Sequence, residues 1–450
     1  FRSKTIHCKG CENKCAITQF SFESGATFFS GNRCEKIFTN SGNYHSNGQN
    51  FYDQKCKLTF DRPVTPENTP RLKIGIPRAL NMYENYPFWN ALLVNCGFEI
   101  MLSGKSTDQL YEKGLGGVMS DNICFPAKLI HSHIIDLVER KPDRIFFPRV
   151  VYEEKEFTDS ANSYNCPVIT GYADILKDLK DQVRYSNIPL DAPAVAFHDK
   201  KLLKKACFQY LKTLRVTRTR FEKAFEKAIL EQKKFRIAKF KRNSEIYQQS
   251  LKDNSLCVLL AGRPYHADPL VHKKVADIIS AMGVNVISEE IVDENDNHNF
   301  SELQTIHQWE YPNRIFKAAL WATDRPGFLH FVQLNSFGCG PDAFIIEELT
   351  ELLKSGGKNH NVIKVDEITS PGSVRLRIRS LIESARLSCQ AKNFNKFNRL
   401  NTPAFERKDQ HRTILAPYFS HLYSDYIPVI FKLLGYNLVN LPPADQKSVD

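Results

Sequence analysis

The stretch that decides the fold is LKIGIP at residues 72–77, a short apolar run that ends at Pro77. Such a run is typical of a buried strand in a parallel sheet. It leads into residues 81–95, which have the composition of a helix, then Gly97 as a helix stop and a second apolar strand at 98–102. A strand, a helix and a strand in this order predict a βαβ unit with parallel pairing.

The same pattern occurs twice more along the chain. In the second copy, the apolar strand 256–260 leads to a helix that ends at Met282 and Gly283, and strand 284–287 follows. In the third copy, strand 413–416 leads to a helix that ends at Leu434 and Gly435, and strand 436–439 follows. A repeat of this kind predicts an α/β protein made of Rossmann-like or flavodoxin-like parallel-sheet lobes.

The sequence divides into five predicted segments. They are a Cys-rich metal-binding module at 1–60, a first α/β lobe at 70–195, a basic helical linker at 196–250, a second α/β lobe at 251–400, and the start of a third α/β unit at 410–450. The third unit, with its helix expected at 420–434, has no cysteine loop, helix and strand after its second strand. We therefore expect it to pack on a neighbour, on the remainder of a longer polypeptide or on a partner chain, through Leu415, Ile430, Leu434 and Leu438.

The positive charge of the chain is concentrated in one segment. Residues 200–242 contain 16 Lys and Arg and three Glu. The net charge of this segment, 16 − 3 = +13, exceeds the net charge of +11 of the whole chain. The favoured interpretation is a pair of linking helices with a solvated basic surface. The alternative is a surface that binds nucleic acid, an acidic partner or the phosphates of a nucleotide-like cofactor.

The cysteine content has to be interpreted in the expected compartment. A hydrophobic share of 42% with 25% charged residues is that of a globular protein. No apolar run approaches the ~20 residues that span a bilayer, and no signal peptide is recognisable, so a cytoplasmic protein is expected. In a reducing cytosol, clustered cysteines indicate metal binding or catalysis instead of disulfides. Cys96, Cys207, Cys257 and Cys389 lie in apolar or helical stretches and are expected to be buried small hydrophobes.

The first cysteine cluster lies at the N-terminus. Cys8, Cys11 and Cys15 fall within eight residues, and Cys34 follows in SGNRCEK. Four thiolates of this spacing predict a tetrahedral zinc site or a [4Fe–4S] cluster, and the two alternatives stay open. The metal would order a segment that has little apolar periodicity.

The second cluster consists of two single cysteines. Cys124 and Cys339 lie in the loops SDNICFPAK (120–128) and NSFGCGPD (335–342), each just before a proline and a helix. We expect two equivalent strand-to-helix loops, one from each lobe, whose helix N–H groups stabilise a thiolate and which face one crevice. Arg263 and His266 in GRPYH are expected at the same sheet edge, either as ligands of an acyl-CoA phosphate or carboxylate, or as loop-fixing groups.

Many motifs in order give the chain a family resemblance. They are CKGCENKC, SGNRCEK, IGIPRALNMYENYPFW, SDNICFPAKLIHSHI, ANSYNCPVITGY, LAGRPYHADP, WEYPNRI, NSFGCGPDA and RIRSLIES, spread over residues 6–441. Together they resemble the acyl-CoA dehydratase activase-related family, which is similar to 2-hydroxyacyl-CoA dehydratase subunits and double-cubane cluster proteins of anaerobic bacteria. In dehydratase-type subunits three cysteines, one per loop, hold a [4Fe–4S] or related cluster. The resemblance matches Cys124 and Cys339 to two of these positions; for the third, this chain has Arg149 in the stretch IFFPRV (145–150) instead of a cysteine, and Cys166 is the candidate substitute.

The resemblance implies an iron–sulfur component that transfers electrons in the reduction or dehydration of CoA thioesters. Its implied partners are an ATP-dependent activator or another electron donor, and a CoA thioester substrate. Whether the chain itself is a dehydratase-like lyase or a reductase component stays open. The rival hypothesis is a zinc-stabilised binding protein whose basic helical segment docks nucleic acid or an acidic partner.

Overall fold

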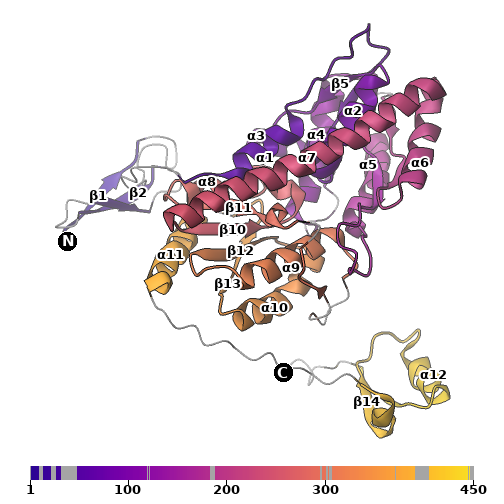
Figure 1. Cartoon of the computed structure of the whole chain (residues 1–450). Coiled ribbons are helices and arrows are strands. Elements are labelled where there is room, and N and C mark those ends of the chain that lie inside the picture. Colours follow the sequence, from indigo (N-terminus) through magenta and orange to yellow (C-terminus); the bar gives the residue numbers. More distant parts are fainter. Residues whose placement is uncertain are drawn as a thin grey trace. The chain divides into compact units, whose positions relative to one another are not determined.

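The computed structural model describes residues 2–9, 14–21, 27–31, 48–118, 120, 122–182, 188–293, 296–300, 303, 307–369, 371–390, 405–443 and 445. The chain divides into two compact units, residues 1–397 and 398–450, and each is described by itself. The predicted mixed α/β architecture with parallel sheets is confirmed (Figure 1).

The first lobe is built on a four-stranded parallel sheet of order β5-β4-β6-β8. Its strands are β4 (Lys73–Ile76), β5 (Glu99–Leu102), β6 (Arg144–Phe146) and β8 (Leu190–Asp191), and its helices are α2 (Met82–Asn95), α3 (Asp108–Gly114), α4 (Phe125–Glu139) and α5 (Pro167–Gln182). A short parallel pair, β7 (Arg149–Tyr152) with β9 (Ala194–Ala196), follows the sheet. Gly97 has φ +92°, the left-handed conformation that the predicted helix stop requires.

The second lobe repeats this arrangement with the parallel order β11-β10-β12-β13. Its strands are β10 (Cys257–Ala261), β11 (Asn285–Ser288), β12 (Leu329–Ser336) and β13 (His360–Val365), and its helices are α8 (Val275–Ser280), α9 (Glu310–Thr323), α10 (Gly340–Ser355) and α11 (Pro371–Gln390). The helix predicted up to Met282 is much shorter than expected. Lys273 and Lys274 have φ of +50° and +56°, and a right-handed helix cannot include them, so α8 starts only at Val275.

The two sheets show which loops are equivalent. In each lobe the first strand lies in the middle, and the third strand, β6 or β12, lies beside it. The cysteine that follows the third strand and precedes the next helix is Cys166 in the first lobe and Cys339 in the second. The expected pairing of Cys124 with Cys339 as equivalent positions is therefore wrong. Cys124 follows a 3-10 turn, Leu115–Gly117, instead of a strand.

The basic segment forms α6 (Lys200–Thr213) and α7 (Arg218–Asp253), as its helical prediction required. In Figure 1, α7 runs diagonally past α2 and on to β11. Its Phe221 and Phe225 lie in the core of the first lobe, and its Ile246 and Tyr247 lie in that of the second. Apart from Lys239, the lysines and arginines of residues 200–242 are exposed or half-buried, while the apolar face makes α7 a shared structural element of both lobes, assisted by α1 (Phe51–Phe60).

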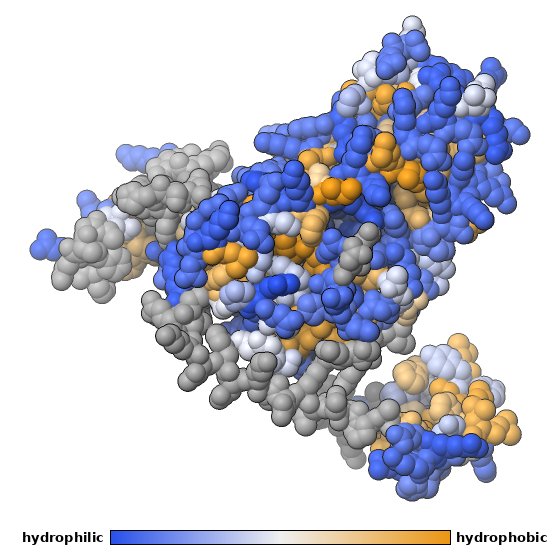
Figure 2. Space-filling view, viewed as in Figure 1, coloured by the Kyte–Doolittle hydropathy of each residue, from blue (hydrophilic) through white to orange (hydrophobic). Residues whose placement is uncertain are grey.

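Two smaller pieces complete the described chain. Near the N-terminus, β1 (Arg2–His7), β2 (Ala16–Ser21) and β3 (Thr27–Ser30) form an antiparallel sheet. In the second unit, β14 (Thr413–Ala416) pairs in parallel with β15 (Asn437–Asn440) across α12 (Ile427–Leu433), which is shorter than the predicted helix at 420–434. Of the four residues expected to pack on a neighbour, only Leu438 is buried within this unit; Leu415, Ile430 and Leu434 are exposed, and Figure 2 shows apolar side chains on its surface.

Three of the four cysteines predicted to be core residues are confirmed as such. Cys96, Cys207 and Cys257 are buried, and the side chain of Cys389 lies outside the described residues. None of the described helices combines the length and the apolar character needed to cross a bilayer.

Candidate functional site

Three cysteines each directly precede a helix. Cys124 precedes α4, Cys166 precedes α5 and Cys339 precedes α10. A proline stands at the first or second position of each helix, where its missing N–H costs nothing because that donor has no partner within the helix. The remaining free N–H groups of the first turn face the cysteine position, which makes it a favourable place for negative charge.

The loops that carry Cys124 and Cys339 are in contact. Gly338 has φ +78°, and a Cβ at this position would lie 2.9 Å from the carbonyl oxygen of Asn122 and 3.7 Å from the Cα of Cys124. Only a glycine fits both this backbone conformation and this distance. The structure thus brings together two loops that are far apart in the sequence.

Tyr265 places Cys166 at the same site. Burial raises the pKa of the Tyr265 hydroxyl well above its usual range, Arg263 opposes this shift, and the Cys339, Cys124 and Cys166 thiolates would raise the pKa further. The hydroxyl is therefore within electrostatic reach of all three sulfurs. Cys166 also packs in the same apolar cluster as Tyr265 and Cys124. The three cysteines come from both lobes and lie near one tyrosine.

The thiols are shielded from water. Burial raises the pKa of Cys124 to about 11, while the backbone N–H of Ala127 in the first turn of α4 acts in the opposite direction. Burial likewise raises the pKa of Cys339. Cys166 and Cys339 are 9% and 8% exposed, and Cys124 is half-buried. Without a cation, Cys124 and Cys339 are neutral at physiological pH; a bound metal ion would reverse this preference.

Arg263 and His266 are buried behind the cysteines. Arg263 forms a bidentate ion pair with Asp342, with Nε 3.0 Å from Oδ2 and Nη2 2.7 Å from Oδ1. His266 accepts a hydrogen bond from the Arg263 N–H through Nδ1 at 3.0 Å, and its Nε2 lies 2.9 Å from Ser336 Oγ. Both residues have the loop-fixing contacts that were one of the two expectations. Burial lowers the pKa of His266 to about 3, so it is neutral.

Arg149 and Cys166 clarify the third cysteine position. Arg149 lies on β7 and forms a half-exposed ion pair with Asp174 of α5, with an Nη1–Oδ2 distance of 2.9 Å. Cys166 precedes that same helix and packs in the same apolar cluster as Tyr265. Arg149 thus pairs with α5 at the surface, while Cys166 lies near Tyr265.

The N-terminal cysteine set is described only in part. Cys8 and Cys15 lie at the loop end of the β1–β2 hairpin, where the Cys8 N–H donates to the Cys15 carbonyl oxygen at 2.8 Å. The hairpin therefore places these two residues opposite each other. Cys11 and Cys34 lie outside the described residues. Among the residues that are described, no three His, Cys, Asp or Glu side chains are arranged to hold one metal ion.

Several residues of the site were not predicted from the sequence. They are Asn165, Tyr265, Gly338 and Asp342. Each lies within three residues of a predicted site residue, so the motifs contained the signal, but which neighbour matters depends on the direction of its side chain. The sequence around Glu153 contained no motif that predicted this buried carboxyl or the ionic network around it.

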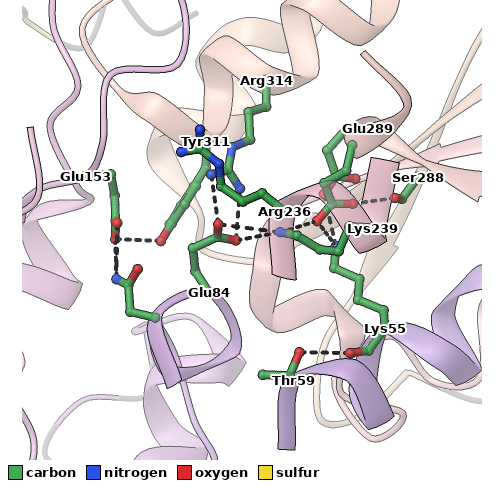
Figure 3. A network of polar contacts seen from close by, with 12 residues as sticks. Lys55, Thr59, Glu84, Glu153, Arg236, Lys239, Ser288, Glu289, Tyr311 and Arg314 are labelled. Carbon is green, nitrogen blue, oxygen red and sulfur yellow. Dashed lines mark hydrogen bonds and ion pairs between the residues drawn. The ribbon is translucent and has the colours of Figure 1, made fainter. Parts of the chain in front are cut away.

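That network lies between the lobes, under α7 (Figure 3). Glu84 of α2 pairs with Arg314 of α9 at 3.0 Å and with Lys239 of α7 at 3.2 Å. Glu290 pairs with Lys239 at 3.2 Å and with Lys55 of α1 at 2.7 Å. All five side chains are less than a tenth exposed, so the two lobes and α7 are fixed to one another by paired buried charges.

No curated protein matches the chain. Among solved structures, a putative sugar binding protein from Salmonella typhimurium LT2 is 9% identical, with 76% of this chain and 92% of that chain covered at a TM-score of 0.20. Nitrogenase Cp1 is 9% identical over 76% and 64% of the two chains, with the same TM-score. Glucosamine-6-phosphate deaminase from Thermotoga maritima is 11% identical over 77% and 94%, with a TM-score of 0.17. At these TM-scores the likenesses carry no argument.

A family model gives the informative match. It covers residues 73–292, from β4 through α7 to the end of the Glu289–Ile291 turn, and it is described as the CoA enzyme activase uncharacterised domain. The match includes Cys124, Cys166, Arg263 and Tyr265. Residues 73–292 of this chain therefore match the CoA enzyme activase uncharacterised domain, in agreement with the expected resemblance to an acyl-CoA dehydratase activase-related family.

Proposed function

We propose that this chain is an iron–sulfur component of an acyl-CoA dehydratase or activase system. The proposal is supported by the position of Cys124, Cys166 and Cys339, each directly before a helix and each near enough to the buried Tyr265 to affect its pKa. A bound iron–sulfur cluster supplies one-electron transfer at low potential. The family match over residues 73–292 supports a role beside a CoA-dependent enzyme.

The donor set fits a cluster better than a single ion. Three thiols with free helix N–H groups behind them match the ligand and hydrogen-bond requirements of an iron–sulfur cluster. A single ion would need ligands already converging on one point, and no such set occurs in the described ranges. Since a cluster spreads its metal atoms over several positions, each thiolate can bind a different one.

The chain's own residues would define the surroundings of the cluster. Tyr265 is buried and lies among the thiols, so its hydroxyl can donate a hydrogen bond to a sulfur ligand. Arg263 and Asp342 fix the start of α10 behind Cys339. The apolar packing around Cys124 and Cys166 excludes water and so favours a low net charge on the site.

The experiment is anaerobic purification followed by iron, zinc and acid-labile sulfide analysis per chain. The proposal predicts a brown protein with iron and sulfide in similar amounts. A colourless protein that contains zinc alone would contradict the proposal and support the rival zinc-stabilised binding protein.

At the N-terminal site the structure is compatible with both metals. The hairpin that places Cys8 opposite Cys15 is a geometry that suits zinc as well as iron. If the basic face of α6 and α7 then docks nucleic acid or an acidic partner, binding must weaken steeply with salt. A filter-binding titration at two ionic strengths measures this directly; binding that does not change with salt contradicts it.

A further inference from the structure

Arg78 of the first lobe stands where Arg263 stands in the second lobe. Arg263 follows the end of the central strand β10 by two residues, and Arg78 follows the end of the central strand β4 by two residues. Each of these strands lies between the second and the third strand of its sheet, so the chain leaves it in opposite directions. In open α/β sheets ligands bind outside the carboxyl ends of the strands at such a point.

The carboxylate that pairs with Arg263 has no counterpart in the first lobe. Asp342 is the third residue of α10, whereas the first turn of the equivalent helix α5 contains no acidic residue. The third residue of α5 is Ile169, which is 1% exposed. Among the residues that the structure describes, Arg78 forms no ion pair. The positive charge that an internal carboxylate balances in the second lobe is therefore left unbalanced in the first.

The Arg78 side chain is nevertheless held in place. Its backbone N–H donates to Ser103 Oγ at 2.8 Å, and its guanidinium carbon lies 5.0 Å from the centroid of the Phe60 ring of α1. The side chain is half-buried, and its Nε is buried without a hydrogen-bond partner in the described part of the chain. The ring orients the guanidinium but supplies no acceptor for its donors. Arg78 is thus an ordered cation with donors to spare.

Lys105 is a second cation at the same sheet edge. The parallel register of β4 and β5 sets Ile76 opposite Leu102. Two residues further along both strands, the same register sets Arg78 opposite Gly104, the neighbour of Lys105. Lys105 is exposed, and within the described ranges it forms no ion pair. Two unpaired cations therefore follow two adjacent strands.

The thiol of Cys56 lies near both cations. Burial and the Asp268 carboxylate raise the pKa of Cys56 to about 11, and Arg78 and Lys105 act against this rise. Cys56 is half-buried in α1, one turn before Phe60. This agrees with the position of Arg78 over the Phe60 ring.

The acidic groups nearby do not pair with these cations. Asp268 is buried, and its Oδ2 accepts hydrogen bonds from the hydroxyls of Tyr83 and Ser106. Its Oδ1 accepts the Leu270 N–H at 2.8 Å. Asp61 ends α1 and is exposed. The Asp268 oxygens are thus occupied by neutral donors, and the cations are open to another anion.

We propose that Arg78 and Lys105 bind an oxyanion group, the carboxylate or phosphate of a small-molecule ligand, at the strand edge of the first lobe. A guanidinium binds such a group through two parallel hydrogen bonds, and an ammonium adds a point charge. Asn81, three residues after Arg78, is fully buried, and neither polar atom of its amide has a partner among the described groups. The ligand group would be for Arg78 what Asp342 is for Arg263. The proposal goes beyond the proposed function and requires none of the crevice cysteines.

The test is equilibrium dialysis of the full chain with radiolabelled inorganic phosphate and, separately, acetate. Chloride keeps the ionic strength constant, so that general screening is the same in every sample. The proposal predicts saturable binding of one ion per chain. Binding of phosphate alone assigns the site to a phosphate group, and binding of acetate alone assigns it to a carboxylate. Absence of saturable binding of both ions would overturn the proposal.

Replacing Arg78 should remove most of the affinity. Arg78→Gln deletes the charge-assisted hydrogen bonds, so the ion that binds the wild type should bind at least about tenfold more weakly. The matched control is Arg149→Gln, which removes the same charge from the half-exposed pair with Asp174 and should bind like the wild type. Equal affinities of the wild type and Arg78→Gln would overturn the assignment.

Two further variants protect this test against misfolding. Arg78→Lys keeps the charge and loses the planar fork, so it should bind more tightly than Arg78→Gln. Lys105→Gln changes an exposed side chain and should weaken binding by about two- to fivefold. Wild-type affinity in Lys105→Gln would contradict a site made by two cations.

Alkylation of Cys56 locates the bound ion. An anion beside Arg78 and Lys105 offsets their stabilisation of the Cys56 thiolate, so phosphate or acetate should slow alkylation of this cysteine in the wild type. Mass spectrometry of the Cys56 peptide measures the rate, and the effect should be absent in Arg78→Gln. An unchanged rate in the wild type would place the ion elsewhere and overturn the proposal. Failure of cluster binding would leave all of these results intact.

Discussion

Arg263 and Asp342 form a bidentate ion pair in which both side chains are buried, with Arg263 Nη2 2.7 Å from Asp342 Oδ1. Arg263 follows the central strand β10, and Asp342 lies in the first turn of α10, three residues after Cys339. The pair therefore fixes the helix start that carries one cysteine to the strand edge of the same sheet. Removing either partner leaves a buried charge without compensation.

Replacing Asp342 should strongly destabilise the protein. Asp342→Ala leaves the Arg263 guanidinium buried and unpaired, which costs about 3–5 kcal/mol of unfolding free energy. The matched control is Glu139→Ala, because Glu139 pairs with Lys113 in a half-exposed salt bridge. Such a pair contributes about 0–1 kcal/mol. Chemical denaturation of both variants measures the difference, and equal losses would contradict the account of the pair.

Gly338 should be necessary for the contact between the Cys124 and Cys339 loops. Gly338→Ala adds a Cβ 2.9 Å from the Asn122 carbonyl oxygen at φ +78°, so the loops must separate at a cost of about 1–2 kcal/mol. We expect less bound iron after anaerobic reconstitution. Gly340→Ala is the control, because nothing lies within 4 Å of its Cβ position. Full iron retention in Gly338→Ala would show that the loops need not touch.

The stability of the protein should depend on pH through Glu153. Its pKa of about 7 in the folded chain exceeds the ordinary value of 4.5, so the folded state binds the proton more tightly than the unfolded state. Its contribution is fully present below about pH 4.5 and is lost as pH rises through 7, a change of about 3 kcal/mol. The difference in unfolding free energy between wild type and Glu153→Gln should show this slope. A flat difference from pH 4.5 to 7 would contradict it.

The second unit should be less protected than the sheets of the two lobes. Its two-stranded sheet leaves Leu415 64% exposed and Leu433 84% exposed, so little apolar area opposes local opening. Amide hydrogen exchange of residues 411–441 should be faster than that of β4 and β10 in the isolated monomer. Equal protection would mean that this unit is stable without a partner.

The repeat at 72–77 and 256–260 predicted the parallel sheets well, because short apolar strands and glycine helix stops depend on local sequence. Gly97, Gly283 and Gly435 all have the positive φ that their role requires. The limit of the same reasoning is the pairing of Cys124 with Cys339. Both precede a proline and a helix, so their local sequences look alike. Only the arrangement of the strands shows that Cys339 follows the third strand of its sheet, whereas Cys124 follows a 3-10 turn.

The basic segment shows a second limit. Charge counting predicted a solvated surface, yet Lys239 is 2% exposed between Glu84 and Glu290. A lysine is buried only where carboxylates from distant segments meet it, and those partners lie 155 and 51 residues away. Neither composition nor periodicity of α7 contains that information. The same applies to Glu153, whose three donors come from three separate segments.

The central claim is that Cys124, Cys166 and Cys339 bind one cluster, and single serine variants test it most directly. Each variant is purified anaerobically, and iron, sulfide and visible absorbance near ~400 nm are measured per chain. The control is Cys56→Ser, since Cys56 is half-buried like Cys124 but lies within α1 instead of directly before a helix. We predict that all three crevice variants lose the same part of the iron and absorbance and remain folded, while Cys56→Ser retains both. Wild-type iron content in any of the three crevice variants would contradict the claim.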